Sequence, residues 1–323
     1  MFLIIGTTTL DIFVSGFDTL PEIEGDEFTS SSLVFCEHPI QMGMGGNGAN
    51  SAYVLAQLGI PVSLHSAIGV DPHGEMLSRW LIDGGVDISG LIESTTAATS
   101  ATTILTDENQ NRLSFHHHGA SALIEPDALP ESIFREIDFL LFSGYPLLTG
   151  WSAEQLQALM KKATDAGTIT CMDIGPLVGD PIHIESLSAV FPYLSYFLCN
   201  EFELLSFTRK DNIQDALSST FNFGNLTVIL KRGADGALIA RQGDSQPVTV
   251  PAFETETNST VGAGDSFNSG FLYGISRGWD EERSAQFGNA VAALVLSSGE
   301  GVLGAPTLNE VQNFLHTNTR KEW

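Results

Sequence analysis

Short, continuously apolar segments alternate with amphipathic stretches along this chain, and this alternation restricts the fold more than any other sequence feature. The apolar segments predict buried strands over residues 2–5, 62–67, 139–143, 168–173, 196–198 and 227–231. The stretches that follow have helical patterns over residues 47–58, 74–83, 152–166, 200–205, 213–219 and 281–297. Strand–helix alternation predicts an α/β fold with a doubly wound, mostly parallel sheet flanked by helices. Ligands of such sheets bind at the carboxyl ends of the strands, and Asp11, Asp173 and Asn200 fall at or shortly after strand ends.

Two segments do not follow the alternation. Residues 11–40 are rich in turn-forming residues, and residues 95–118 alternate polar and apolar side chains around the polar turn 107–111. The second segment predicts a hairpin. We expect the two segments to form a small β lid within a single domain of residues 1–323, and such a cover would exclude water from a site beneath it.

A turn of small residues, Gly262, Ala263 and Gly264, leads into Asp265 and an apolar helical pattern. The backbone N–H groups at a helix start lack intrahelical partners and bind anions. A carboxylate beside such amides predicts two roles, because it can take a proton from a hydroxyl while the amides stabilise negative charge. The simpler alternative is that Asp265 only caps the helix.

The segment from Gly43 to Gly48 contains a G-x-G-x-x-G pattern. A dinucleotide-binding fingerprint should follow the first strand directly, whereas here a long irregular segment intervenes. The sequence instead favours a polyhydroxylated ligand that Asn47 and Asn50 contact through their side-chain amides. Helix capping by Asn47 is the structural alternative.

Three further groups of polar residues are candidates for ligand contacts. Glu203 lies at a predicted helix start, where the helix dipole stabilises a carboxylate. The functional alternative is that this carboxylate contacts Mg²⁺ through water. Lys231 and Arg232 end a strand beside Gly233, which predicts contacts to phosphates or a solvated hairpin end. The three histidines 116–118 alternate faces on an extended strand, so they converge poorly on a metal ion, although one or two could face a ligand.

Composition limits the partners. The chain carries 39 acidic against 14 basic residues, for a net charge of −25, and shows no basic patch for a nucleic-acid backbone. No apolar run approaches the ~18 residues of a membrane helix, and the first apolar run is too short for a signal peptide. Three widely separated cysteines are typical of a reducing compartment. We therefore expect a cytoplasmic protein that binds neither nucleic acid nor membrane.

These motifs together resemble the ribokinase/PfkB family of carbohydrate kinases, and the resemblance extends over essentially the whole chain. It rests on Asp11, Gly45-Gly46-Asn47-Gly48-Ala49-Asn50, Asn200-x-x-Glu203, Lys231-x-Gly233, Gly262-Ala263-Gly264-Asp265 and Asn289. The resemblance implies a ribokinase-like core with a β lid. It also implies phosphorylation of a hydroxymethyl group on a sugar or sugar derivative, with ATP and Mg²⁺ as cofactors.

The resemblance also implies a role for each matching residue. The implied catalytic residues are Asp265 as the base and, as the anion hole, Gly262, Ala263 and Gly264. The implied sugar contacts are Asp11, Gly45, Gly46, Asn47 and Asn50. The implied nucleotide contacts are Asn200, Lys231, Gly233 and Asn289, with Glu203 organising Mg²⁺ through water.

Two departures from the family pattern stand out. Ser259 occupies a position where members with a monovalent-cation site often carry Asp, and the segment after Asp173 lacks the Asn and Arg of many sugar kinases. The alternatives are a nucleoside kinase of the same family and, less favoured, a nicotinamide-dependent oxidoreductase or a non-catalytic sugar-binding regulator. A homodimer through the exposed edges of the lid is a further expectation.

Overall fold

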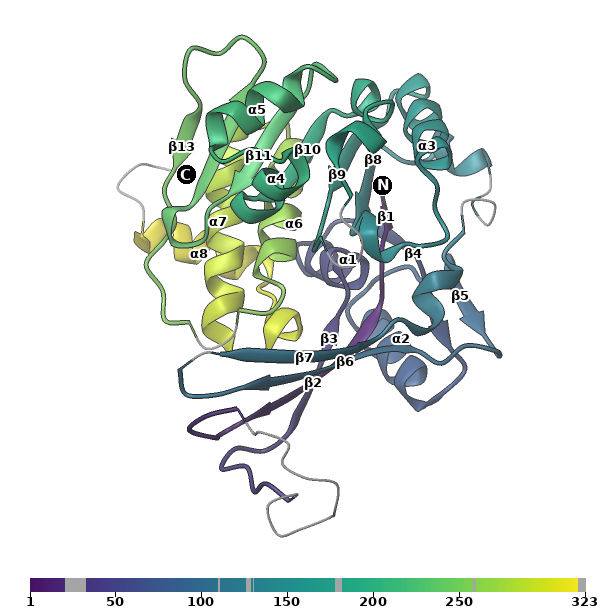
Figure 1. Ribbon diagram of the computed structural model, residues 1–323, viewed down its shortest axis with the longest axis vertical. Coiled ribbons are helices and arrows are strands. Elements are labelled where there is room, and N and C mark those ends of the chain that lie inside the picture. Colours follow the sequence, from purple (N-terminus) through teal and green to yellow (C-terminus); the bar gives the residue numbers. More distant parts are fainter. Residues whose placement is uncertain are drawn as a thin grey trace.

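The computed structural model describes residues 1–20, 33–109, 111–125, 129, 131–177, 182–257 and 260–318. Two sheets organise this part of the chain, a nine-stranded main sheet and a four-stranded lid (Figure 1). Ser259 and residues 21–32 of the predicted lid segment 11–40 lie outside the described residues.

The main sheet has the doubly wound topology that the alternation predicts. From one edge to the other its strands are β13 (Val248–Val250), β12 (Ala237–Arg241), β11 (Thr227–Lys231), β10 (Tyr196–Asn200), β9 (Ile169–Asp173), β8 (Phe139–Ser143), β1 (Phe2–Ile5), β4 (Val62–Gly69) and β5 (Leu91–Ser94). The strands from β11 to β5 are parallel, and β12 and β13 are antiparallel additions. The chain winds outward from β1 through β4 to β5 and then returns to β8, so the switch point lies between β1 and β8.

All six predicted strands are present, with ends within two residues of the predicted ones. The prediction missed β5, β12 and β13. The strands β12 and β13 follow β11 as an antiparallel meander with no helix between them, so a search for strand–helix alternation passes over them.

Helices cover both faces of the main sheet. One face carries α1 (Asn47–Gln57), α2 (Pro72–Asp83), α6 (Ala263–Ser276), α7 (Glu281–Ser298) and α8 (Leu308–Asn318). The other face carries α3 (Ala153–Asp165), α4 (Glu201–Thr208) and α5 (Ile213–Phe221). Side chains of β1 alternate between the two cores, with Ile4 in the first and Ile5 in the second. This alternation explains why the parallel strands are apolar throughout.

Short 3₁₀ helices lie in the connections between these elements. They are η2 (Gly119–Leu123), η4 (Glu131–Arg135), η5 (Tyr145–Leu147), η6 (Ile184–Leu187), η7 (Phe191–Tyr193), η8 (Gly233–Asp235) and η9 (Gly301–Gly304).

The predicted lid is a separate sheet that projects from one end of the main body (Figure 1). Its strands are β3 (Gln41–Gly45), β2 (Thr9–Ser15), β6 (Ser100–Thr106) and β7 (Arg112–His117), in that spatial order. The β6–β7 pair is the predicted hairpin, and β2 pairs with β6 in parallel. Asp11 therefore lies within a lid strand, at the start of the segment 11–40 from which the sequence predicts part of the lid.

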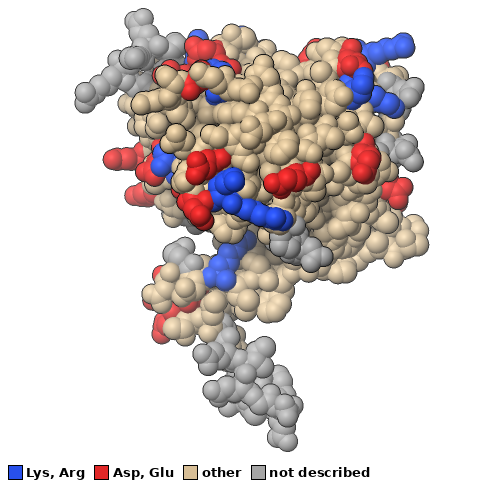
Figure 2. All heavy atoms as spheres, turned by 45° about the horizontal axis from the view of Figure 1, so that its top comes forward, with Lys and Arg blue, Asp and Glu red and all other residues tan. Residues whose placement is uncertain are grey.

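Two surface properties complete the description. Basic side chains are few and lie among acidic ones on the face that Figure 2 shows. Among the helices of the described residues, none combines the length and apolar character that crossing a bilayer requires. The cytoplasmic location and the single-domain organisation stay predictions.

Candidate active site

Helix α6 begins at the glycine turn, and Asp265 lies in its first turn. The helix starts at Ala263, two residues before the predicted start, and its N-cap is Gly262 with a left-handed φ of 75°. No side chain caps the helix, so its first amides keep their unpaired N–H groups. The idea that Asp265 serves as the cap is wrong, because its side chain is buried and points to another helix.

That other helix is α1, whose two asparagines hold the Asp265 carboxylate. Asn50 Nδ2 donates to Asp265 Oδ2 at 2.8 Å, and Asn47 Nδ2 donates to Asp265 Oδ1 at 3.2 Å. The N-cap of α1 is Gly46, with a φ of 88° and no capping side chain, so Asn47 does not cap the helix. Each carboxylate oxygen therefore has an amide donor from the segment that the sequence assigned to the sugar.

Burial dominates the electrostatics of Asp265. Desolvation, with a further contribution from the charge of Asp173, raises the pKa of the Asp265 carboxyl to about 6 from its ordinary value of 3.8. The amides of Asn50 and Asn47 and the ammonium group of Lys231 act in the opposite direction. The carboxylate is thus ionised at neutral pH, yet it is a better proton acceptor than an exposed aspartate.

A buried ion pair lies beside the glycine turn. Lys231 Nζ is 2.7 Å from Asp173 Oδ2, and the two side chains are 14% and 2% exposed. Asp173 also accepts hydrogen bonds from the Asn268 amide and, at 2.8 Å, from the Gly175 N–H. Burial lowers the pKa of Lys231, but the carboxylates of Asp173, Glu203 and Asp265 outweigh it and hold this pKa above its usual value. Lys231 therefore stays charged although it is buried.

The lysine of this pair also reaches the start of α6. A Cβ atom on Gly264 would lie 3.5 Å from Lys231 Nζ, so the ammonium group borders the first turn of the helix.

The sequence reading did not select Asn268 as a site residue. Its position three residues after Asp265 places it on the same side of α6, and this spacing is the signal that could have found it.

Asn200 and Glu203 form a reciprocal capping box at the start of α4. The Asn200 N–H donates to Glu203 Oε2 at 2.8 Å, and the Glu203 N–H donates to Asn200 Oδ1 at 2.8 Å. Burial raises the pKa of the Glu203 carboxyl to about 7, the Lys231 charge opposes this shift, and the Asp173 charge adds to it. Glu203 therefore belongs to the same charge cluster as Asp265, whereas the Asn200 side-chain oxygen is already used by the cap.

Asp11 contributes from the lid. A Cβ atom on Gly45 would lie 2.3 Å from Asp11 Oδ2, so only glycine at this position leaves room for the carboxylate. Burial raises the pKa of Asp11 to about 6, while a hydrogen bond from Thr102 and the charge of Arg112 act to lower it. Since Gly45 and Gly46 lead directly into Asn47, the lid carboxylate lies close to the helix that holds Asp265.

Gly233 lies in a turn, and Asn289 packs against the end of a strand. Gly233 has a φ of 56° in the turn η8 after β11, with open space around it. The Asn289 amide donates to the carbonyl oxygens of Val250 and Pro251, at 3.3 and 3.0 Å. The structure thus gives Asn289 a packing role between α7 and the end of β13.

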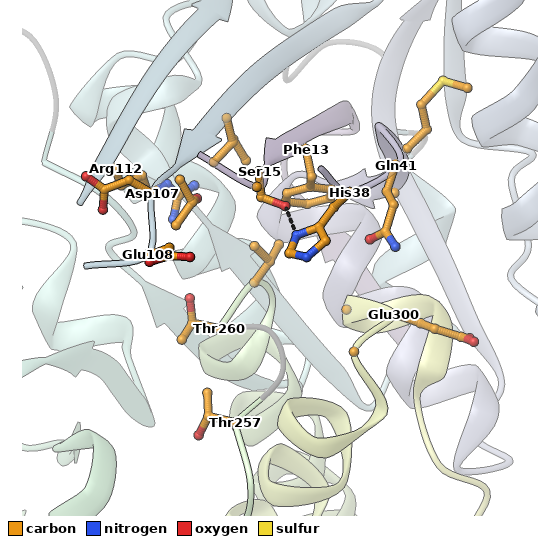
Figure 3. Close-up of a pocket in the computed structure, with 18 of the residues that line it drawn as sticks. Phe13, Ser15, His38, Gln41, Asp107, Glu108, Arg112, Thr257, Thr260 and Glu300 are labelled. Atoms are coloured by element: carbon orange, nitrogen blue, oxygen red, sulfur yellow. Dashed lines mark hydrogen bonds between the residues drawn. The ribbon is translucent and has the colours of Figure 1, made fainter. Parts of the chain in front are cut away.

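A cavity of about 750 Å³ lies between the lid and the main body (Figure 3). Phe13, Ser15 and Arg112 line it from the lid, and Thr260 and Glu300 line it from the segments next to α6 and α7. Its lining also includes Gly43, two residues before Gly45, and Val261, directly before Gly262. The cavity therefore lies next to the cluster around Asp265, although Asp265 itself does not line it.

Comparison with known proteins identifies the family. The family model described as pfkB family carbohydrate kinase matches residues 22–308. The chain is 28% identical to a 5-dehydro-2-deoxygluconokinase from Shouchella clausii, over 83% of this chain and 85% of that protein. It is 28% identical to an ATP-dependent ribose-1-phosphate kinase from Halopiger xanaduensis, over 92% of each chain.

A solved structure shares the fold. Arabidopsis thaliana ribokinase complexed with ribose and ATP superposes with a TM-score of 0.81 and 21% identity, covering 97% of this chain and 98% of that one. The predicted ribokinase-like core with a β lid is thereby confirmed.

Proposed function

Because this chain belongs to the pfkB family of carbohydrate kinases, we propose that it transfers the γ-phosphoryl group of ATP to a hydroxymethyl group of a sugar or sugar derivative. The observation that carries the proposal is the Asp265 carboxylate, buried in the first turn of α6 and held by the amides of Asn47 and Asn50. The base, the anion-binding amides and a cation thereby stand within one cluster.

In this proposal Asp265 takes the proton of the acceptor hydroxyl. Its two amide partners fix the direction of the carboxylate, and its raised pKa of about 6 brings its basicity closer to working pH. Asp11, on the lid side of the same site, would hold another hydroxyl of the acceptor together with the segment around Gly45 and Gly46.

The residues present fit a nucleoside triphosphate. The amides at the start of α6 lack a side-chain cap, and the Lys231 ammonium group lies beside Gly264. The amides and the ammonium group can therefore both stabilise negative charge at the start of this helix. When bound, ATP supplies the phosphoryl group and Mg²⁺ offsets its charge. Asn200 and Gly233 would border the nucleotide. The amide of Asn289 is engaged with backbone carbonyls, which leaves this residue a supporting role there.

Glu203 is the residue we propose for Mg²⁺. Its Oε2 atom accepts from the backbone of Asn200, so its other oxygen is the one left to orient a metal-bound water. Within the described residues no group of three His, Cys, Asp or Glu side chains could hold a metal ion. Mg²⁺ characteristically takes one or two carboxylates and keeps several waters, which suits a single contact of this kind.

The lid also supports a proposal on assembly. Met42, Leu113 and Phe115 are 53%, 42% and 58% exposed, and the strand register places them on the face opposite to Asp11. We propose that this face pairs with a second copy of the chain. Light scattering should give a dimer mass for the wild type and a smaller mass for Phe115→Glu.

A panel of acceptors tests the reaction. The purified protein is mixed with ATP and Mg²⁺ and with D-ribose, ribose 1-phosphate, D-fructose, 5-dehydro-2-deoxygluconate or adenosine, and ADP release is coupled to an optical signal. We expect ADP release that depends on one of the sugars, with the phosphorylated product identified by mass spectrometry. Turnover with adenosine alone would identify a nucleoside kinase instead, and the absence of any acceptor dependence would reject the proposed reaction.

A further inference from the structure

The lid carries a row of three polar side chains on the face that holds Asp11. The strand register pairs Asp11 on β2 with Thr102 on β6, and Thr102 with His116 on β7. Paired residues of neighbouring strands project from the same face of a sheet, and the next residue along a strand projects from the opposite face. His116 therefore shares a face with Asp11, while His117 lies on the other face.

One hydrogen bond and the strand register link the members of this row. The distance between Thr102 Oγ1 and His116 Nδ1 is 3.1 Å, and Thr102 lies directly opposite Asp11, whose pKa it lowers. A hydroxyl has one proton, and an ionised carboxylate can only accept. We infer that Thr102 donates to Asp11, its neighbour in the register, and accepts from the Nδ1–H group of His116.

This arrangement fixes the tautomer of His116. In a neutral imidazole one nitrogen carries the proton and the other is an acceptor, and the hydrogen bond of one nitrogen decides the state of the other. With the proton on Nδ1, the Nε2 atom presents a lone pair. Within the described part of the chain, the only hydrogen bond of the His116 ring is the one to Thr102, so Nε2 is open to a ligand.

The row begins at the candidate site. The Asp11 carboxylate occupies the space beside Gly45, and this glycine segment leads into Asn47, which donates to Asp265. His116 is the outer end of the same row, and its ring packs edge-on against His118 at 5.7 Å between centroids. An acceptor molecule whose hydroxyls reach Asp11 thus has His116 as a neighbour on the lid.

We propose that His116 determines acceptor specificity, with Nε2 accepting a hydrogen bond from a hydroxyl group of the acceptor sugar. This inference rests on the proposed kinase function and names the chemistry of one part of its substrate. A hydroxyl has a proton to donate to Nε2, whereas an ionised carboxylate or phosphate has none. The acceptor therefore carries a hydroxyl group, and not an anionic group, where it meets β7.

The surroundings favour the neutral ring. Burial lowers the pKa of His116, and the charges of His118 and His117 lower it further. Asp11 on β2 and Arg112 on β7 are charged groups on the same face of the lid. At neutral pH the ring then keeps its acceptor lone pair.

Two variants at adjacent positions test the proposal with the best sugar acceptor among D-ribose, D-fructose and 5-dehydro-2-deoxygluconate. His116→Leu removes the acceptor nitrogen, and His117→Leu makes the same change on the opposite face. Since one hydrogen bond is worth about 0.5–1.5 kcal/mol, we expect His116→Leu to raise the acceptor KM about 3- to 10-fold, with kcat and the ATP KM unchanged. His116→Gln, which restores an acceptor oxygen, should recover part of the loss, and His117→Leu should match the wild type. Equal acceptor KM values for the two leucine variants, or a loss confined to kcat, would overturn the proposal.

A second measurement needs no turnover, so it separates this inference from the proposed reaction. ¹⁵N NMR of the full chain at pH 8 reports the tautomer of each histidine ring. We expect the Nδ1–H form for His116 and its loss in Thr102→Val. An Nε2–H form in the wild type would refute the role assigned to the lone pair, whatever the kinase assay shows.

Discussion

Asn50 on α1 donates a hydrogen bond of 2.8 Å to the carboxylate of Asp265 on α6, although 215 positions separate the two residues in the chain. Asn47 adds a second donor at 3.2 Å, so one helix fixes both oxygens of the proposed base. The contact depends on close packing, because a Cβ atom on Gly48 would lie 2.6 Å from the backbone of Gly6 after β1. Helix α1 can therefore approach the sheet closely enough to meet the start of α6.

The first prediction concerns the proton-accepting role of Asp265. Asp265→Asn keeps the size of the side chain but cannot take a proton at working pH. General-base catalysis contributes about 10²–10⁴-fold, so we expect kcat to fall by that order while the Kd of ATP is held or tightened. Steady-state kinetics and calorimetric titration measure the two quantities. Near-normal kcat in a correctly folded variant would remove Asp265 from the mechanism.

The second prediction concerns how the free energy of unfolding depends on pH in the wild type and in Asp265→Asn. Burial raises the pKa of Asp265 from 3.8 to about 6, so the folded protein binds this proton more tightly than the unfolded chain does. Ionisation therefore lowers the free energy of unfolding as pH rises from about 4 to 7, and this contribution is absent from Asp265→Asn. Urea unfolding at pH 5 and pH 8 should show the wild type losing stability relative to the variant at the higher pH. A difference independent of pH would contradict the raised pKa.

A third prediction separates the contribution of Lys231 to stability, through its ion pair with Asp173, from its proposed contribution to ATP binding. Lys231→Met leaves the Asp173 carboxylate buried without its cation, and breaking a buried pair in this way typically destabilises a protein by about 3–5 kcal/mol. The double variant Lys231→Met/Asp173→Asn removes both charges and should recover most of this stability. We expect ATP binding to stay weak in both variants, as measured by calorimetry. Wild-type ATP affinity in the double variant would mean that Lys231 only neutralises Asp173.

The fourth prediction compares two glycines with left-handed backbones. Gly262 has a φ of 75° and Gly59 a φ of 80°. A Cβ atom on Gly262 would lie 2.4 Å from Val302 Cγ1, whereas one on Gly59 would meet open space. Alanine at either position should therefore cost about 1 kcal/mol of backbone strain, but only Gly262→Ala should also displace the start of α6.

Kinetics distinguish the two alanine variants. We expect Gly59→Ala to keep wild-type kcat and Gly262→Ala to lose at least about tenfold, because the anion-binding amides move with the helix start. Equal kcat values in the two variants would show that the turn before α6 does not position catalytic groups.

Local sequence patterns predicted the elements of this fold well where each element is defined by its own residues. The run Phe2–Ile5 is buried throughout because a parallel strand contacts two cores, and its limits match the prediction. The hairpin of β6 and β7 was predicted from its alternation and polar turn. The short strand Val248–Val250 was missed, since it has only three residues and forms by pairing with β12.

The sequence predicted many of the residues of the candidate site, but not the contacts between them. Asp265 and Asn47 were selected for separate tasks, yet the structure joins them by a hydrogen bond. Asn289 was assigned to the nucleotide side, while its amide holds the backbone at Val250. Motif spacing records which residues are present, and it contains no information on which distant side chains satisfy one another.

The sequence by itself determined the α/β class, the lid and the glycine turn before Asp265, because these features depend on local periodicity and on the conformations that glycine permits. The family followed from the resemblance of the motifs, in their order along the chain, to the ribokinase/PfkB pattern. Only the tertiary structure decided that α1 clamps Asp265, that Lys231 neutralises Asp173, and that His116 shares a lid face with Asp11. The physical reason is that burial and close approach set hydrogen-bond partners and pKa values, and both arise when elements far apart in the chain pack together.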